Sequence, residues 1–318
     1  MLRWAEPVAV PVPRRSTASS PPFRTGPPRT HPGIRVPGRA RSTRRASPPH
    51  PRWSPGGRST VSFILLSPRS GAEVAGAEYL DVLRATGLQP DELEQRVLDS
   101  PDSTPGPLDG ADGVIVGGSP FTVTAPLDDT WQPLVSRRLV DLVTTAPVPV
   151  FLACYGASLL ADSLGGDVVR THPEQAGLST VHLTDAARED PVCAGLPSTF
   201  GALTGHTENV GRVPDGAVVL ATGPTCPIQL YRWGDRVWTS QFHPEMDGAG
   251  MVRRMAFYPD HGYFDAGAGD EIAAALRPVV AAEAGQLLRN FVTHCRELAA
   301  GRGARGGHVA QASSTISM

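Results

Sequence analysis

The chain has 318 residues, 40% of them hydrophobic, which is enough for one or two domains with a sizeable core. The sequence contains no run of about 18 apolar residues, which excludes a membrane-spanning helix. Its four cysteines are widely spaced and include no CxxC pair, which excludes a disulfide scaffold and a zinc ribbon. The formal net charge of −2 is the average of two unlike parts.

The first part is a basic N-terminal segment. Residues 1–60 hold 12 arginines, 13 prolines and one acidic residue, Glu6, whereas the remainder holds 17 arginines and 30 acidic residues. Because this segment has too little apolar surface to offset its ordering entropy, we expect it to be disordered. Three interpretations stay open: a misassigned start with translation beginning near Val61, an organelle transit peptide, or an arginine-rich arm that binds nucleic acid. The first is favoured, so nucleic-acid binding is not expected.

The next part alternates short apolar runs with amphipathic stretches. Apolar runs rich in β-branched residues predict buried strands, and apolar residues at helical spacing predict helices. In chain order we expect a strand at 62–67, a helix at 73–86 that ends at Gly87, strands at 97–98 and 113–116, a helix at 129–145, a strand at 148–153 and a helix at 159–164.

The second half is richer in strands and ends in a helical stretch. We expect strands at 180–183, 218–221, 228–233 and 237–242, a hairpin turn at Gly234-Asp235, and a helical stretch at 270–298 interrupted near Pro278. Residues 61–299 then form one domain, and the Gly- and Ser-rich residues 300–318 form a flexible tail. Alternating apolar strands and helices predict an α/β fold, a three-layer sandwich with a mostly parallel central sheet.

A cysteine at a strand-to-helix junction is the strongest local signal. The apolar run VPVFLA ends at Cys154, and Tyr155-Gly156 leads into a helical pattern. This is the layout of a nucleophile elbow, in which a sharp turn exposes the nucleophile and the helix N-terminus offers N–H groups to a developing oxyanion. The alternative is a buried cysteine that acts as a small hydrophobe.

A candidate base for this thiol lies in the segment QFHPE. His243 follows an apolar strand, Pro244 forces a bend, and Glu245 comes two residues later. A nucleophilic thiol needs a base, and the base needs a group that orients it, so Cys154, His243 and Glu245 could form a triad. A surface histidine beside an unrelated glutamate is the alternative.

Two further segments are candidates for substrate contacts. Gly117 and Gly118 end the strand GVIV, where glycines allow backbone N–H groups to face a substrate oxygen. His206 lies in the segment Gly205–Glu208, for which a solvated loop is the competing interpretation. Arg253-Arg254 could meet an anionic partner, although a solvated helix face is favoured for both.

Together these segments resemble the class I glutamine amidotransferase family, whose members hydrolyse glutamine to glutamate and ammonia. The resemblance rests on LACYGAS at 152–158, QFHPE at 241–245 and VGGSP at 116–120, whose order and spacing agree over about residues 61–299. In detail the chain is similar to stand-alone proteins that resemble the glutaminase part of GMP synthase. The resemblance implies the flavodoxin-like fold of the family.

The resemblance also implies residue roles. Cys154 would attack the amide and form a thioester, His243 would move the proton, Glu245 would orient His243, and the N–H groups of Gly118 and Tyr155 would form the oxyanion hole. The predicted oxyanion and substrate-binding residues are Gly117, Gly118, Tyr155, Gly156, Ser158 and His206.

The chain departs from the family pattern near the nucleophile. Leu152 stands where the family has glycine, Ala157-Ser158 where it often has His-Gln, and Ser119 where it has proline. The lack of Lys rules out a P-loop of the GxxxxGK[ST] type, so the ammonia acceptor would be bound by a separate synthase protein.

Three functions stay open beside this resemblance. The favoured one is a glutaminase that supplies a partner synthase, the second is a stand-alone hydrolase of γ-glutamyl amides, and the third is a non-catalytic binding protein of the same fold. No cofactor, metal or membrane is expected, and the expected location is cytoplasmic. The remaining cysteines, Cys193, Cys226 and Cys295, are expected to be structural.

Overall fold

The computed structural model describes residues 62–125, 131–259 and 261–312, without the side chains of Ala266 and residues 303–312. The chain divides by its internal contacts into two units, Met1–Pro55 and Gly56–Met318. All of the described residues lie in the second unit. The expectations for residues 1–60 therefore lie outside the described residues.

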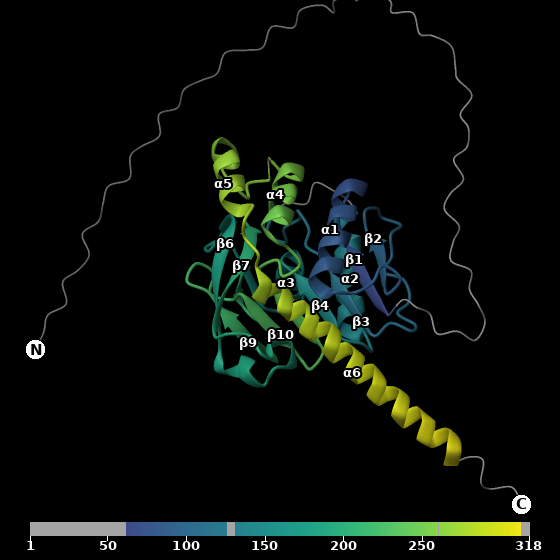
Figure 1. The fold of residues 1–318 in the computed structure, drawn as a ribbon. Helices are drawn as coiled ribbons and strands as arrows, with labels where there is room; N and C mark the ends of the chain where they lie inside the picture. The colour runs from purple at the N-terminus through teal and green to yellow at the C-terminus, as the bar shows by residue number, and fades with distance from the viewer. Residues whose placement is uncertain (1–61, 126–130, 260, 313–318) are drawn as a thin grey trace, which may run out of the picture. The chain divides into compact units, whose positions relative to one another are not determined.

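A nine-stranded sheet forms the centre of the described unit (Figure 1). Its first five strands in spatial order pair in parallel, and the other four pair antiparallel. The spatial order is β2 (Leu93–Val97), β1 (Phe63–Ser67), β3 (Gly113–Val116), β4 (Val150–Ala153), β11 (Val237–Ser240), β10 (Leu230–Trp233), β9 (Ala217–Thr222), β6 (Glu174–Leu183) and β7 (Thr199–His206). A small second sheet pairs β5 (Asp167–Val169) with β8 (Asn209–Arg212).

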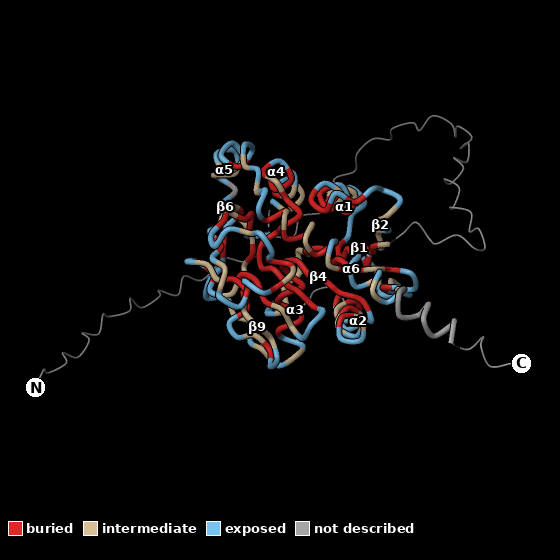
Figure 2. Tube along the Cα trace, turned by 60° about the horizontal axis from the view of Figure 1, so that its bottom comes forward, coloured by how far each residue is buried: buried red, intermediate tan, exposed pale blue. Residues whose placement is uncertain are grey.

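Helices cover both faces of the parallel half. Phe63 and Leu65 of β1 point to one face, in a core shared with α1 (Ala72–Thr86) and α6 (Ala282–Ala312). Ile64 and Leu66 point to the other, in a core shared with α2 (Gln132–Thr145) and α3 (Tyr155–Ser163). This alternation follows from the two-residue period of a strand. Figure 2 shows the buried strands between helices whose outer sides are exposed.

A smaller helical layer lies beyond the carboxyl end of the sheet. It consists of α4 (Gly248–Phe257) and α5 (Gly269–Leu276), which pack through Met251, Met255 and Leu276 against Ala176 and Leu203 of the antiparallel strands. The short 3-10 helices are η1 (Asp185–Glu189), η2 (Pro191–Cys193) and η3 (Ala266–Ala268). This layer matters for function because it stands over the carboxyl end of β4.

Most elements match the sequence expectations. The strand at 113–116 and the αL end of α1 at Gly87 are confirmed. The strand expected at 97–98 is present as β2 but begins earlier, at Leu93, and ends at Val97, and the helix expected from 159 begins at Tyr155. The helix α6 continues through Ala312, into the range where a flexible tail is expected.

Several elements of the second half were not expected: β5, β7, β8 and α4. The strand β7 has the sequence TFGALTGH, whose glycines and alanine have low strand propensity, so pairing with β6 stabilises it rather than local preference. The helix α4 begins GAG, which disfavours a helix, but the Asp247 side chain caps it by accepting the N–H of Gly250 at 2.7 Å. Among the described residues, no helix combines the length and apolar character needed to cross a bilayer.

Candidate active site

Cys154 sits at a strained turn between β4 and α3. Its φ of 49° is the only positive φ of a non-glycine residue in the described part of the chain. Such a conformation costs about 1–3 kcal/mol and persists only where the surroundings impose it. Here the Cys154 N–H donates to the Ser240 carbonyl at 2.7 Å, which ties the turn to β11. The expected elbow geometry is therefore present, and Cys154 is 7% exposed.

Leu152, which departs from the family motif, is accommodated by Gly156. A Cβ atom at position 156 would lie 2.6 Å from Cβ of Leu152, so only glycine fits opposite this side chain. The first turn of α3 passes directly over β4 at this point. Leu152 thus fills space beneath the turn, and the elbow keeps its shape.

His243 and Glu245 form a buried pair. Nδ1 of the His243 ring lies 2.8 Å from Oε1 of Glu245. The backbone N–H of His243 donates to the Leu203 carbonyl at 2.8 Å. Burial alone would lower the pKa of His243, but the Glu245 carboxylate and Cys154 outweigh it and raise the pKa to about 9. Burial would raise the pKa of Glu245, but His243 and Arg254 lower it to about 2. The pair therefore favours an imidazolium held by a carboxylate.

A buried ion pair braces the two glycines that follow β3. Nη2 of Arg69 lies 2.8 Å from Oε1 of Glu78, and neither side chain is exposed. Arg69 also donates to the Gly118 carbonyl, and a Cβ atom at Gly117 would lie 2.2 Å from Oε1 of Glu78. On its other side, Gly118 faces His243, whose Cε1 would lie 2.7 Å from an added Cβ. Both positions therefore require glycine.

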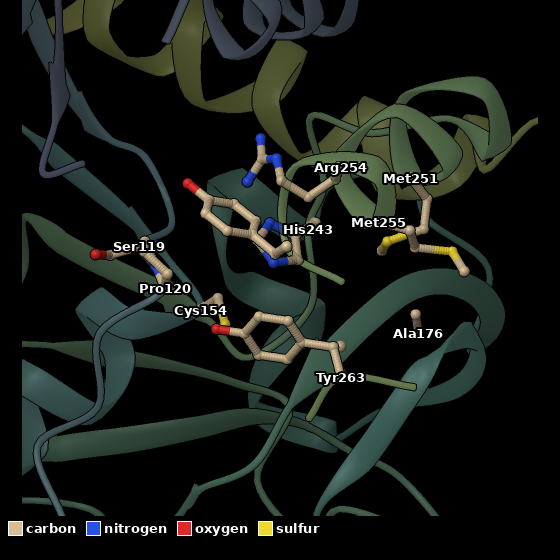
Figure 3. Close-up of a pocket in the computed structure, with 11 residues that line it drawn as sticks. Ser119, Pro120, Cys154, Ala176, His243, Met251, Arg254, Met255 and Tyr263 are labelled. Carbon is tan, nitrogen blue, oxygen red and sulfur yellow. The ribbon is translucent and has the colours of Figure 1, made fainter. Parts of the chain in front are cut away.

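One cavity, the histidine-side pocket, opens on the His243 side of Cys154. Cys154, His243, Arg254, Tyr258 and Tyr263 are among its lining residues, and it encloses about 420 Å³ of space, mouth included. In Figure 3, Arg254 and His243 lie on one side of Cys154 and Tyr263 on the other.

A second cavity, the serine-side pocket, lies on the helix side of Cys154. Its lining includes Tyr155, Ser158, His206 and Gln241. Three buried polar atoms there have no hydrogen-bond partner among the described residues: Ser158 Oγ, His206 Nδ1 and Gln241 Oε1. Buried polar groups are rarely left unpaired without a ligand or ordered water, so this pocket is built to receive a polar group.

The orientation of His206 is set from behind by Glu174. Nε2 of His206 lies 3.0 Å from Oε2 of Glu174, which also accepts from the side chains of Thr204 and Gln229. Burial would raise the pKa of Glu174, but His206 and the hydroxyl and amide donors lower it to about 2. Because an ionised carboxylate only accepts, Nε2 carries the proton and Nδ1 of a neutral His206 is an acceptor.

Among the described residues, one group of side chains has the spacing of a metal site, and it includes Glu174 and His206. Glu174, His206 and Cys226 each offer a ligand atom within 4.8 Å of the others. However, the Glu174 carboxylate is already occupied by its donors, and burial raises the pKa of the Cys226 thiol to about 12, which keeps it protonated. These residues fit a hydrogen-bonded support for His206 better than a metal centre.

The structure brings most of the expected site residues together around Cys154. Tyr155, Ser158 and His206 share one pocket with it, and His243 shares the other. The solvated-loop interpretation of the Gly205–Glu208 segment is wrong, because His206 and Glu208 are buried. Gly156 supports the turn rather than lining either pocket.

Other functional residues were missed or misread from the sequence. The solvated-face interpretation holds for Arg253, whose side chain is 50% exposed, but is wrong for Arg254, which lines the histidine-side pocket. Arg69, Glu78 and Glu174 carry no sequence signal of their own, because their partners lie far along the chain. The helical phase of α4 could have separated Arg253 from Arg254 had that helix been expected.

Known proteins resemble this chain in sequence and in fold. The family model described as "Glutamine amidotransferase class-I" matches residues 86–257. The chain is 32% identical over 154 residues to one subunit of the glutamine-hydrolysing GMP synthase of Sulfolobus acidocaldarius, covering 48% of this chain and 77% of that protein. It is 30% identical over 151 residues to the subunit of the same name from Sulfurisphaera tokodaii, covering 47% and 76%.

A solved structure supports the fold. A glutamine amidotransferase from Thermotoga maritima superposes with a TM-score of 0.55 at 18% identity, covering 74% of this chain and 98% of that one. At that identity the likeness concerns the fold alone. It confirms the expected α/β class with its large central sheet.

Proposed function

The chain belongs to the class I glutamine amidotransferase family, and on that premise we propose that it hydrolyses the side-chain amide of glutamine through a Cys154, His243 and Glu245 triad. The observation that carries the proposal is the strained Cys154 at the mouth of a pocket shared with His243, whose ring is held by Glu245 at 2.8 Å. A strained nucleophile, a base and a group that orients the base are the parts that thiol-based acyl transfer needs.

The chemistry follows from these positions. His243 takes the proton of the Cys154 thiol, the sulfur attacks the amide carbon and forms a C–S bond, and the C–N bond breaks as His243 gives that proton to the leaving nitrogen. Water, deprotonated by His243, then attacks the thioester and releases glutamate and the free thiol. Because Glu245 holds the pKa of His243 at about 9, the ring carries the proton that the leaving nitrogen requires at neutral pH.

Two backbone N–H groups would stabilise the tetrahedral oxyanion. The N–H of Tyr155 belongs to the first turn of α3, whose N–H groups lack partners within the helix. The N–H of Gly118 lies in the turn braced by Arg69 and Glu78, beside His243. A braced donor needs no rearrangement as charge develops on the oxygen.

The serine-side pocket would hold the amino-acid end of the substrate. Its three unpartnered atoms include the acceptors His206 Nδ1 and Gln241 Oε1, and Ser158 Oγ can also accept. Acceptors suit the N–H groups of an α-ammonium. Glutamine, or another γ-glutamyl amide, would then present its amide carbon to Cys154.

We further propose that the ammonia passes to a separate synthase protein, which binds the acceptor. The relatives from Sulfolobus and Sulfurisphaera are each named as one subunit of a glutamine-hydrolysing GMP synthase, which supports a second subunit. A stand-alone γ-glutamyl amide hydrolase is the second candidate. Ala157 and the unpartnered Ser158, which replace the His-Gln of the family motif, favour it.

Covalent labelling tests the proposed function. The intact mass is measured after incubation with a diazo-ketone analogue of glutamine, for the wild type, Cys154→Ala and Cys226→Ala. One adduct on the wild type and on Cys226→Ala, absent from Cys154→Ala, is expected. An adduct that survives in Cys154→Ala, or wild-type protein that neither forms an adduct nor releases ammonia from glutamine, would contradict the proposal.

A further inference from the structure

Arg254 lines the histidine-side pocket and forms no ion pair among the described residues. Its Nη2 atom is buried and has no hydrogen-bond partner among the described residues. The residue belongs to α4, and its side chain lines the same cavity as Cys154 and His243 (Figure 3). Its neighbour Arg253 instead faces outward and pairs with Asp81 at 2.7 Å.

The nearby acids are engaged elsewhere. Glu78 is paired with Arg69 at 2.8 Å, and Glu245 with His243 at 2.8 Å. Burial and the neighbouring Arg69 lower the pKa of Arg254, so its environment disfavours a lone cation. A guanidinium nitrogen that is buried without a bound anion is costly, and a bidentate carboxylate is the anion that best matches the geometry of a guanidinium.

The side of Cys154 on which Arg254 lies identifies the part of the substrate it would meet. During C–N cleavage the leaving nitrogen must lie beside the group that protonates it. That group, His243, lines the histidine-side pocket, whereas the acceptor atoms suited to an α-ammonium line the serine-side pocket. The leaving amine therefore departs into the pocket that contains Arg254.

We propose that this site acts on γ-glutamyl amides whose amine portion bears a carboxylate, and that Arg254 binds that carboxylate. The inference rests on the proposed function, because it requires the same Cys154 chemistry. Beside glutamine, the site would then accept γ-glutamyl conjugates of small amino acids, with the glutamyl part in the serine-side pocket.

The walls of the pocket fit such an amine. Met251, Met255 and Tyr258 line this pocket together with His243 and Arg254. Methionine side chains adapt to short aliphatic chains of different shapes. A pocket of about 420 Å³, mouth included, has room for an amine of a few non-hydrogen atoms, such as glycine.

The reaction balances without a further reagent. For γ-glutamylglycine, the Cys154 thiol gives its proton to His243 as the sulfur adds to the γ-carbonyl, the C–N bond breaks, and glycine leaves with that proton. Water then breaks the C–S bond and gives glutamate. Arg254 takes no proton, and its role is to bind the carboxylate of the leaving glycine.

A pair of nearly isosteric substrates tests the inference. γ-Glutamylglycine carries the carboxylate, and γ-glutamylglycinamide replaces it with a neutral amide of the same size. We measure kcat/KM for both with wild type, Arg254→Gln and, as a matched control on the same helix, Arg253→Gln. The wild type and Arg253→Gln should prefer the carboxylate about 10- to 100-fold, the range of a charge-assisted hydrogen bond, and Arg254→Gln should show a ratio near 1.

The ratio within one protein stays meaningful even if a variant loses overall activity. Diazo-ketone labelling of Cys154 in Arg254→Gln shows whether its site is intact. Two results would overturn the inference and leave the proposed function standing. One is a wild type that hydrolyses glutamine but does not prefer γ-glutamylglycine over γ-glutamylglycinamide. The other is an Arg254→Gln protein that keeps the wild-type ratio of the two kcat/KM values. A wild type that neither hydrolyses any of the three amides nor labels at Cys154 would overturn both.

Discussion

The Nδ1 atom of His243 lies 2.8 Å from Oε1 of Glu245, and both side chains are buried. Only Pro244 separates the two residues, so the bend at the proline turns the carboxylate back onto the ring. The neighbouring ring atom Cε1 faces Gly118 and leaves no room there for a side chain. The imidazole is thus held at Nδ1 and confined at Cε1, and its charge depends on Glu245.

Glu245→Gln should keep the shape of this pair and remove its charge. Burial would then act on His243 without the carboxylate, so the pKa of the ring should fall from about 9. We expect kcat to fall about 100- to 10,000-fold, the range seen when a carboxylate that orients a histidine is neutralised. Chemical shifts of ¹⁵N-labelled histidine against pH, together with kcat, measure both effects.

The exposed Glu189→Gln serves as the control for loss of a negative charge. It should leave the His243 titration and kcat unchanged. An unaltered His243 titration in Glu245→Gln would show that the carboxylate does not govern the ring.

The sequence predicted the part of the site in which neighbours along the chain are also neighbours in space. Cys154 followed by glycine and helix, and His243 two residues before Glu245, are local patterns whose geometry follows from a turn and a proline bend. The parallel strands were also predictable from local sequence, because runs such as Phe63–Ser67 are buried on both faces and therefore apolar along nearly their whole length.

The rest of the site depends on contacts between distant segments. Arg69 reaches the Gly118 carbonyl, and Glu174 collects donors from β7 and from the loop between β9 and β10, with no periodicity to reveal either. The glycines at the start of α4 hide this helix in the sequence. Without the helix, the sequence does not show which side of α4 Arg254 faces, so its solvated-face interpretation is wrong. Tertiary packing decides these positions, and local propensity does not.

Gly156→Ala should distort the elbow through Leu152. An added Cβ would lie 2.6 Å from Cβ of Leu152, a distance that side chains do not tolerate. We expect a loss of about 1–3 kcal/mol in the free energy of unfolding, as for overpacked cores, and a fall in kcat as Cys154 shifts. Urea unfolding and glutaminase assays measure the two.

The clash should be relieved by shortening its partner. Leu152→Gly alone opens a cavity. The double variant Leu152→Gly with Gly156→Ala should lose about 1 kcal/mol less free energy of unfolding than the two single variants lose together. Strict additivity would mean that Leu152 and position 156 are independent, contrary to their close approach. The pair therefore tests why this chain combines a leucine with the elbow glycine.

Glu174→Gln should alter how stability depends on pH. The folded pKa of about 2 lies below the ordinary value of 4.5, so the carboxylate stabilises the fold above about pH 4.5 and loses this contribution as the pH falls toward 2. The shift corresponds to at most about 3 kcal/mol. We expect the variant to be less stable than wild type at pH 7 and the gap to narrow between pH 5 and pH 3.

Urea titrations at several pH values measure this gap. Asp185→Asn, at an exposed carboxylate, is the control and should follow the wild-type curve. A gap that stays constant with pH would show that Glu174 stabilises through packing alone. Because Glu174 orients His206, the KM for glutamine should also rise in Glu174→Gln.

The contribution of the Arg69–Glu78 ion pair to stability should be separable from its contribution to positioning the Gly117-Gly118 turn. Removing one partner of a fully buried ion pair leaves an uncompensated charge, so Arg69→Met or Glu78→Gln alone should cost about 3–5 kcal/mol. The double variant Arg69→Met with Glu78→Met has no charge left at this pair. Its free energy of unfolding, measured in urea, should return to within about 1–2 kcal/mol of wild type.

The double variant isolates the positioning part, because the Gly118 carbonyl still lacks its donor. We therefore expect a stable protein in which kcat falls while KM for glutamine changes little. The reason is that the Gly117-Gly118 turn would contact the oxyanion rather than the amino-acid end of the substrate. A stable double variant with wild-type kcat would show that the ion pair supports only the fold.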